Sequence, residues 1–277
     1  MRRRARRILG TVALHAGLGG AAIVTALPLL WMVSASLMPA GEASAVPPRF
    51  LPSVPTLAHY RTLFARLDLG RNFANSVLVA AVVTGVALVL NSMAGYGFAK
   101  FRFAGRERLF RGLMAALVIP GQVAMLPLFL LLKRLGLVDT YAAVVIPGMA
   151  SIFGIFLVRQ YMTSLPDSVL DAARIDGAGE LRIYRSLVLR LSAPILVTLA
   201  IFTFMGTWND FLWPLVVLAD DRLYTLPVAL ANLAGEHVQD TELMMAGAVL
   251  TVLPVLVVFV ALQRWYVAGI TAGGVKG

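Results

Sequence analysis

The chain has no cysteine and few charged residues. Only 14% of its 277 residues are charged and 59% are hydrophobic, whereas an average soluble domain has about 25% charged residues. The lack of cysteine excludes a disulfide-stapled secreted domain and any thiolate metal or redox site. The high hydrophobic content excludes intrinsic disorder, and the scarcity of charge argues against a water-soluble fold of this size.

Several catalytic patterns are also missing. No G-x-x-x-x-G-K-[ST] segment occurs, so energy for any transport must come from a partner or a gradient. No G-x-S-x-G elbow occurs, which argues against a hydrolase. His15, His59 and His237 lie far apart without metal-ligand spacing. We therefore expect no catalytic residue and no metal site, and we expect that the chain is not an enzyme.

What the sequence does contain is long apolar runs. A helix needs roughly 20 apolar residues to cross a membrane, and runs this long do not suit barrel strands, which alternate over ~10 residues. The fold class predicted is all-α, a polytopic membrane protein with one permease domain over 1–277. The six predicted transmembrane helices lie at about 8–33, 72–99, 110–132, 140–160, 193–219 and 243–264.

The basic residues predict the orientation of these helices. The N-terminal arm, the second and fourth connections and the C-terminal tail carry 17 of the 24 Lys and Arg residues. Because basic residues concentrate in the cytoplasm, both termini are expected inside. The first apolar run exceeds the 7–15 residues of a signal peptide core, which favours an uncleaved helix. The scattered basic residues form no nucleic-acid recognition module, so the net charge of +10 is assigned to topology and anionic lipid.

The segment 164–191, on the predicted cytoplasmic side, does not fit a plain helix bundle. Pro166 and Asp167 suit a helix start, and Gly177 suits a left-handed helix end. A second helix is expected to follow, with one face formed by Leu181, Tyr184, Val188 and Leu191. Two interpretations remain open: an interfacial helix on lipid, or a docking site for a cytosolic partner. The four acidic residues of the segment argue against simple adhesion to anionic lipid.

Asp210 interrupts the apolar run 193–219 near its outer end. An ionisable residue within a membrane span is a functional candidate by default. The tryptophans beside Asp210 suit either an aromatic belt at the membrane interface or stacking on sugar rings, so packing and pathway lining both remain open. The candidates for a translocation pathway are Trp208, Asn209, Asp210 and Trp213.

Four segments resemble a known family. Residues 171–178 read D-A-A-R-I-D-G-A, which resembles the EAA loop of bacterial ABC-importer permeases. Motifs of sugar-uptake permeases are resembled by residues 91–103 (N-S-M-A-G-Y-G-F-A-K-F-R-F), 208–215 (W-N-D-F-L-W-P-L) and 269–277 (G-I-T-A-G-G-V-K-G). The chain is thus similar to carbohydrate-importer permeases of the maltose-system G (MalG-like) type.

The resemblance implies a fold, a function and partners. The fold would be the type I ABC importer permease (MetI-like) architecture, in the bacterial cytoplasmic membrane. The chain would translocate a di- or oligosaccharide, or another solute such as glycerol phosphate. Its partners would be a second homologous permease subunit, two ABC ATPase subunits that hold ATP and Mg, an extracytoplasmic solute-binding protein and membrane lipids. No nucleic acid and no cofactor in this chain are expected.

The resemblance also assigns residues. The EAA loop, residues 164–191, would sit in a cleft of the ATPase and transmit its closure. The ATPase-coupling residues would be Asp171, Ala172, Ala173, Asp176, Gly177 and Ala178, with Asp171 paired to a basic residue of the ATPase. Asp171 replaces the Glu of the family pattern, and Arg190 replaces a Pro. In the tail, either ATPase contact or a frayed end is expected for Gly273, Gly274 and Lys276.

Two functions of other classes remain open. A gradient-driven carrier tends to need ionisable groups within several spans, and here only Asp210 interrupts one. A membrane scaffold without transport is the other. An adjacent gene for a related permease and one for a binding protein would favour import, and their absence would favour the scaffold.

Overall fold

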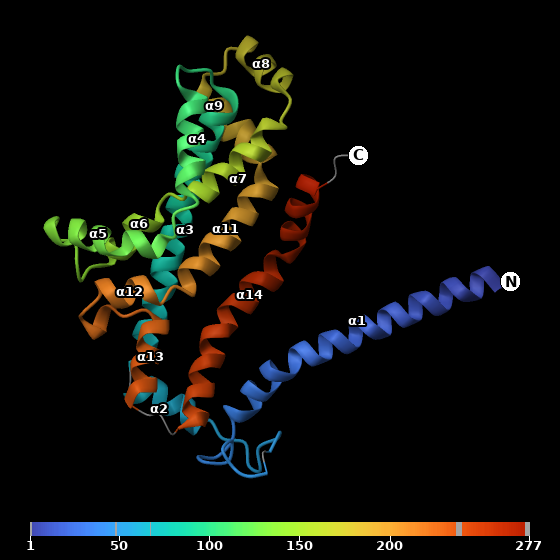
Figure 1. Ribbon diagram of the computed structural model, residues 1–277, viewed down its shortest axis with the longest axis vertical. Coiled ribbons are helices and arrows are strands. Elements are labelled where there is room, and N and C mark those ends of the chain that lie inside the picture. Colours follow the sequence, from blue (N-terminus) through green and yellow to red (C-terminus); the bar gives the residue numbers. More distant parts are fainter. Residues whose placement is uncertain (1, 48, 67, 237–239, 275–277) are drawn as a thin grey trace. The chain divides into compact units, whose positions relative to one another are not determined.

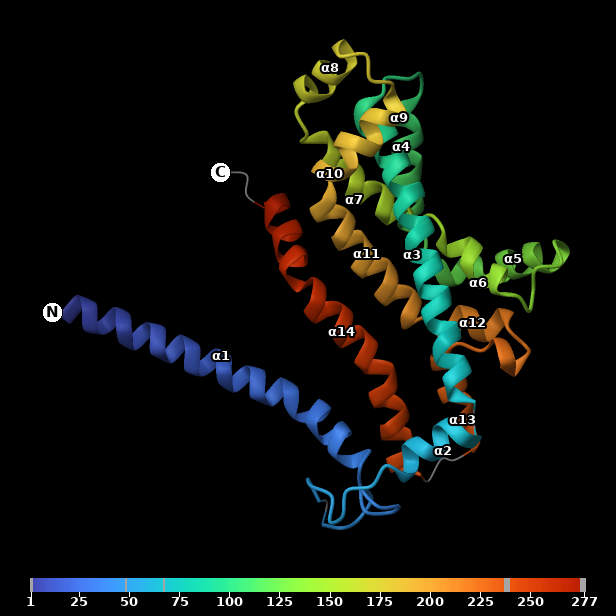
Figure 2. The same ribbon diagram turned by 180° about the vertical axis from the view of Figure 1, so that it is seen from behind.

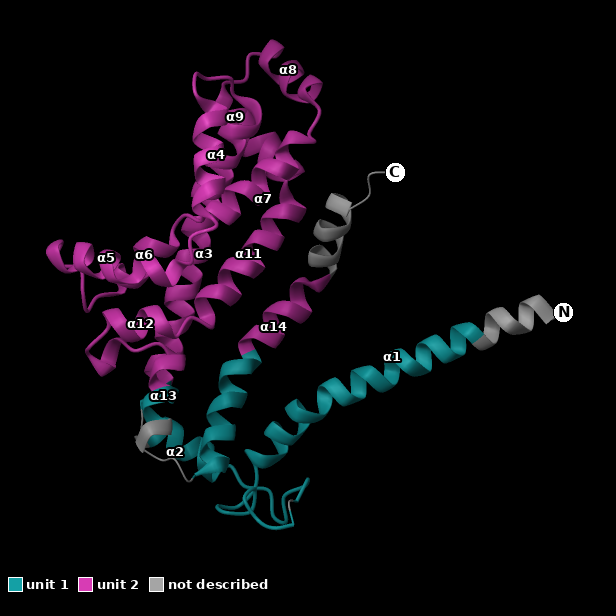
Figure 3. Cartoon of the chain, viewed as in Figure 1, with its two compact units in different colours: residues 1–69, 230–253 teal, residues 70–229, 254–277 magenta. Residues whose placement is uncertain are grey.

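The computed structural model describes residues 2–47, 49–66, 68–236 and 240–274, and over these residues it contains helices and no strand (Figure 1). The predicted all-α fold class is confirmed. The chain forms two compact units, residues 1–69 with 230–253 and residues 70–229 with 254–277 (Figure 3). Neither unit is one continuous stretch of chain, because residues of both units lie in α13 (Leu226–Glu236) and in α14 (Thr241–Gly274).

The first unit contains α1 (Arg2–Ala35) and α2 (Ala58–Arg66), joined by an irregular proline-rich connection. Acidic side chains hold this connection in place. Glu42 accepts a 3.0 Å hydrogen bond from the backbone N–H of Ser53 and pairs with Arg49 at 3.1 Å. Glu242, only 1% exposed, accepts a 2.7 Å bond from the N–H of Ala43. Two backbone donors of this proline-rich loop are thus satisfied by carboxylates rather than by a helix.

The second unit holds most of the helices. They are α3 (Leu69–Lys100), α4 (Arg106–Ala116), α5 (Gly121–Arg134), α6 (Tyr141–Gly148), α7 (Ile152–Thr163), α8 (Asp167–Ile175), α9 (Glu180–Ile183), the π-helical turn η1 (Tyr184–Val188), α10 (Leu189–Leu191), α11 (Ala193–Trp208), α12 (Leu212–Val217) and the 3₁₀ turn η2 (Asp221–Leu223). Seen from both sides, α4, α8 and α9 gather at one end of α3, and α5, α6 and α12 lie together nearer its other end (Figures 1 and 2).

Three of the expected membrane helices are interrupted. The run 110–132 divides between α4 and α5, whose axes differ by 101°, because Pro120 has no N–H to continue the helix. The run 140–160 divides between α6 and α7, just after Pro147, and the run 193–219 divides at residues 209–211. Among the described residues, four helices are long and apolar enough to span a membrane, or up to six if each bent pair counts as one span.

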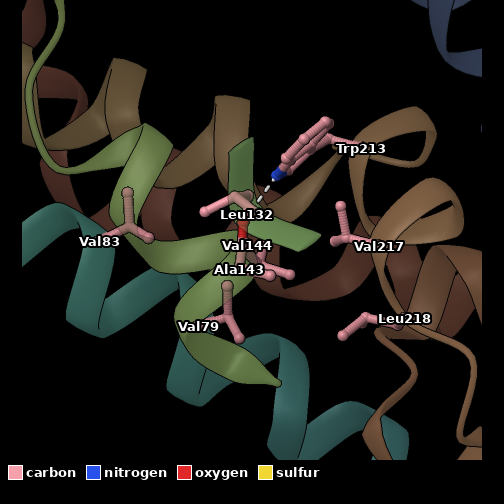
Figure 4. Close-up of a cluster of buried hydrophobic side chains, with 8 residues drawn as sticks. All are labelled: Val79, Val83, Leu132, Ala143, Val144, Trp213, Val217 and Leu218. Atoms are coloured by element: carbon pink, nitrogen blue, oxygen red, sulfur yellow. Dashed lines mark hydrogen bonds between the residues drawn. The ribbon is translucent and has the colours of Figure 1, made fainter. Parts of the chain in front are cut away.

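Two hydrophobic cores stabilise the second unit. One joins α3, α5, α6 and α12 through Val79, Val83, Leu132, Ala143, Val144, Trp213, Val217 and Leu218 (Figure 4). The other joins α3, α7, α11 and the segment 164–191 through Tyr96, Val158, Met162, Leu170, Ile183, Tyr184, Val188 and Leu199. The predicted cytoplasmic segment is therefore packed on membrane helices by its own apolar side chains.

A close helix contact lies beside the second core. A Cβ atom added to Gly95 of α3 would lie 2.7 Å from Cγ1 of Val158 and 3.1 Å from the backbone nitrogen of Arg159, both on α7. Small residues allow such close backbone approach between membrane helices. Gly97, on the same helix, has no atom within 4 Å of the corresponding position.

We predict that Gly95→Ala destabilises this packing whereas Gly97→Ala does not. Overpacking a tight contact costs typically 1–3 kcal/mol, which exceeds the gain of about 0.5–1 kcal/mol from replacing a helical glycine by alanine. Thermal unfolding of the detergent-purified variants measures the difference. Equal unfolding temperatures for both variants would contradict the contact.

Candidate functional site

The EAA loop, residues 164–191, folds as two short helical segments around a tight turn. The first, α8, begins after Pro166, whose φ of −63° suits a helix entry. Gly177 ends it with φ of +80°. The N–H of Gly177 donates to the carbonyl of Arg174 and the N–H of Ala178 donates to that of Ala173, both at 3.0 Å. This bonding pattern is a Schellman motif, in which a left-handed glycine closes the helix.

The second helical segment comprises α9, η1 and α10. Of the four residues expected on one face, Tyr184 and Val188 are buried, whereas Leu181 and Leu191 are 64% and 41% exposed. Ile183, the last residue of α9, is buried in the same core directly before the π-helical turn.

One side of the EAA loop is packed and the other is free. Leu170 of α8 is 1% exposed and belongs to the core shared with α3, α7 and α11. The residues expected to couple to an ATPase lie together around the turn: Asp171, Ala172, Asp176 and Gly177 are exposed, and Ala173 and Ala178 are partly buried against that core. Ile175 is 86% exposed beside them. The loop thus exposes small, acidic and apolar residues on one side, while its other side is packed in the hydrophobic core.

A chain of polar contacts joins the two segments of the EAA loop to α3. Arg174 pairs with Asp171 at 2.7 Å and with Glu180 at 2.7 Å. The hydroxyl of Tyr96 on α3 donates to Glu180 at 3.0 Å. The hydrogen bond from Arg174 holds the pKa of Glu180 below its usual range, and the two carboxylates raise the pKa of Arg174. Arg174 and Glu180 therefore both stay charged at neutral pH, and their ion pair joins the turn to α9.

Lys100 makes a second connection at the end of α3. Its ammonium group donates to the carbonyl of Leu165 and to Asp167, each at 2.6 Å. The Lys100 side chain is 6% exposed, and its hydrogen bond lowers the pKa of Asp167. A third connection is the 2.6 Å hydrogen bond between the hydroxyls of Ser92 and Tyr184. These hydrogen bonds and the shared apolar core join the EAA loop to this end of α3 at several points.

Apart from Asp171, the residues of this network were not predicted to be functional from the sequence. Tyr96 and Lys100 lie within the resembled segment 91–103, where only the pattern of residue types was used. Glu180 was counted only as one of four acids. The signal in the sequence was that Arg174 lies near acidic residues of opposite charge. A sequence does not show which of several acidic residues an arginine side chain binds.

A cavity of about 370 Å³ lies between the broken helices of the same unit. It is lined by Val83, Gly121, Gln122, Met125, Leu128, Val144, Pro147, Gly148, Thr207, Asp210, Leu212 and Trp213. Trp213 is held by a 2.9 Å hydrogen bond from its indole nitrogen to the carbonyl of Ala143 (Figure 4). Asp210 accepts a 3.4 Å bond from the N–H of Trp213.

The structure separates the four pathway candidates. Asp210 and Trp213 line the cavity, whereas Trp208 and Asn209 do not. Trp208 is 1% exposed and packs against Phe73 and Phe204, with ring centroids 5.6 and 5.9 Å away. Asn209 is exposed and donates to the carbonyl of Met205 at 2.8 Å, at the end of α11.

The candidate tail contacts fall at the edge of the described chain. Gly273 and Gly274 are the last residues of α14. Lys276 lies outside the described residues. Contact of this tail with an ATPase therefore stays a prediction.

Comparison with known proteins identifies the family. The family described as "Binding-protein-dependent transport system inner membrane component" matches residues 91–272. The arabinooligosaccharides transport system permease protein AraQ of Halalkalibacterium halodurans is 38% identical over the full length of both chains. The lactose transport system permease protein LacG of Rhizobium radiobacter is 33% identical over 98% of each chain.

A solved structure agrees with these relatives. A chain of a bacterial ABC transporter involved in the import of the acidic polysaccharide alginate superposes with a TM-score of 0.81 at 25% identity, covering 95% of this chain and 98% of that one. The expected resemblance to MalG-like carbohydrate-importer permeases is confirmed. In this family ATP is hydrolysed by separate subunits, so the chain itself is not an enzyme. The chain belongs to the binding-protein-dependent transport system inner membrane components, the permease subunits of ABC importers.

Proposed function

We propose that this permease translocates a sugar and that its EAA loop receives the movement of a cytosolic ATPase. The observation that carries the proposal is the exposed turn at 171–178, fixed to α3 by Leu170, Lys100 and the Arg174 network. A loop that only rested on lipid would not need this anchoring. Its exposed acids also argue against anionic lipid, since like charges repel.

The substrate proposed is a di- or oligosaccharide. The relatives are named for arabinooligosaccharides and for lactose, and the solved neighbour belongs to an importer of alginate. All of these are carbohydrates, which supports a carbohydrate for this chain. Glycerol phosphate, the alternative raised by the sequence, has no specific observation in its favour.

The proposed assembly lies in the bacterial cytoplasmic membrane with both termini inside. The family implies ATPase and solute-binding partners. We propose in addition that a second, homologous permease completes a heterodimer and that two ATPase subunits bind ATP and Mg. The tail residues Gly273, Gly274 and Lys276 are proposed to contact those subunits.

The proposed mechanism is rigid-body coupling. When the ATPases close, the EAA loop moves with them, and α3 follows because three polar connections and a shared core join it to the loop. Tightly packed elements shift as units rather than deform continuously. Asp171 is 60% exposed while paired to Arg174, so one of its faces is free to accept a bond from a basic residue of the ATPase.

Gly177→Pro is expected to abolish transport-coupled ATPase activity, whereas Gly179→Pro is not. Proline fixes φ near −65° and removes the N–H, but Gly177 has φ of +80° and donates to Arg174. Gly179 has φ of −69°, which proline adopts without strain. The measurement is ATP hydrolysis by the assembled importer in liposomes with and without its binding protein. Equal, normal activities in both variants would overturn the role of the turn.

Asp171→Lys is expected to weaken binding of the ATPase, and Asp171→Glu is expected to preserve it. The lysine removes the pair with Arg174 and would repel a basic partner. A hydrogen bond to a charged group contributes about 1.5–3 kcal/mol, so the affinity should fall by about tenfold or more. Titration of purified ATPase onto the permease in nanodiscs measures this. An unchanged affinity in Asp171→Lys would contradict the assignment.

Lys100→Met is expected to lower the sugar transported per ATP without preventing ATPase binding. Methionine keeps much of the apolar stem but loses both hydrogen bonds to the EAA loop. Arg108→Met is the matched control, since the Arg108 side chain makes no hydrogen bond and no ion pair with the described part of the chain. Uptake and ATP hydrolysis are measured in the same proteoliposomes. Identical ratios of sugar uptake to ATP hydrolysis in both variants would show that Lys100 does not take part in coupling.

A further inference from the structure

The cavity beside Asp210 is where three helix interruptions meet. Gly121 opens α5 after the break that follows α4, Gly148 closes α6 before the next break, and Asp210 lies in the break between α11 and α12. All three belong to the unit formed by residues 70–229 and 254–277. The breaks are far apart in the sequence, so their meeting at one cavity is a property of the fold.

Helix breaks within the hydrocarbon region are energetically unfavourable unless protein buries the freed backbone groups or a polar cavity solvates them. An unsatisfied backbone group in hydrocarbon is strongly unfavourable, and irregular backbone is tolerated only where protein buries it or where it lines a water-filled cavity. Membrane transport proteins place discontinuous helices at their substrate sites for this reason. The arrangement around the cavity therefore indicates a site for a polar ligand.

The side chains in the cavity define the chemistry of that ligand. The Gln122 amide, the Thr207 hydroxyl and the Asp210 carboxylate are the polar groups of the lining, and its other members are apolar. Within the described part of the chain, neither Gln122 nor Thr207 makes a side-chain hydrogen bond, and Asp210 has no cationic partner. A carboxylate only accepts hydrogen bonds, while an amide and a hydroxyl both donate and accept.

This combination fits a neutral sugar and excludes an anionic ligand. Sugar hydroxyls donate to a carboxylate and exchange hydrogen bonds with an amide and a hydroxyl. The wall formed by Trp213, Met125 and Leu128 offers an apolar surface for the C–H groups of a sugar ring. A uronate or a phosphate would meet the carboxylate of Asp210 with no cation in the lining to offset the repulsion.

We infer that the cavity is a binding subsite for one end of an uncharged saccharide, recognised by Gln122, Thr207 and Asp210. The volume of about 370 Å³ lies at the lower end of the range of about 300–1,000 Å³ for ligand pockets, so the cavity holds part of an oligosaccharide. The inference rests on the proposed function as a sugar permease. It adds the charge class of the substrate and two residues that the sequence did not single out.

Asp210 also has a structural role that the test must separate from binding. Its carboxylate accepts from the backbone N–H of Trp213 in the first turn of α12. Asp210→Asn keeps an oxygen acceptor at this position, because asparagine caps helices as well as aspartate does. The same change removes the charge, which is what a sugar hydroxyl would contact.

The experiment is uptake by the complete importer in proteoliposomes, with its own binding protein and ATPases. The probes are lactose, raffinose and arabinotriose as neutral saccharides and an alginate trisaccharide as an acidic one. The variants are Asp210→Asn, Gln122→Leu and Thr207→Val. Met125→Leu, an apolar change in the same lining, is the matched control, and ATP hydrolysis stimulated by the binding protein is measured alongside uptake.

We expect the unmodified importer to take up a neutral saccharide and not the acidic one. Asp210→Asn, Gln122→Leu and Thr207→Val should each lower uptake by about tenfold, the effect of losing one hydrogen bond of about 1.4 kcal/mol, with stimulated ATP hydrolysis retained and Met125→Leu unchanged. Normal uptake in all three polar variants, or preferred uptake of the acidic probe, would overturn the subsite while leaving a sugar importer in place. Uptake of no saccharide by the unmodified importer would overturn the proposed function, and the subsite with it.

Discussion

The packing of the EAA loop against α3 is the interaction on which coupling between an ATPase and the membrane helices depends. A turn of this kind is exposed by necessity, because a partner must reach it, and exposed loops are ordinarily the least rigid part of a protein. Here the exposed turn directly follows Leu170, which is 1% exposed. Arg174 and Lys100 pair with three of the four acidic residues of the loop. Exposure and rigidity are thereby combined in one short segment.

The same unit also combines helices suited to lipid with breaks that leave polar backbone groups in the interior. Prolines near the helix breaks free backbone groups that lipid cannot satisfy, yet the core around Trp213 holds the broken pieces together (Figure 4). Trp213 belongs both to that core and to the cavity wall. The helix α3 takes part in both hydrophobic cores, through Tyr96 in one and Val83 in the other. A movement of the EAA loop would therefore be passed along α3 to the core around Trp213.

Much of the fold followed from the sequence, because apolar runs and glycine chemistry are local signals. The helix start at Pro166–Asp167 and the left-handed turn at Gly177 depend only on nearby residues, and both are present. The breaks at 117–120 and 209–211 were not foreseen, since membrane helices often tolerate proline and only tertiary packing decides where a helix bends. For the same reason the sequence grouped Trp208 with Asp210, whereas one side chain packs in a core and the other lines a cavity.

The most direct test is whether the EAA loop and α3 move as one piece. The absence of cysteine allows spin labels to be attached at Ile175→Cys on the loop and Met93→Cys on α3, both at exposed positions. Distances between the labels are measured by pulsed electron resonance in the assembled importer, without nucleotide and trapped with ATP. Rigid coupling predicts one distance distribution in both states. A shift approaching one helical turn, about 5.4 Å, would contradict rigid coupling.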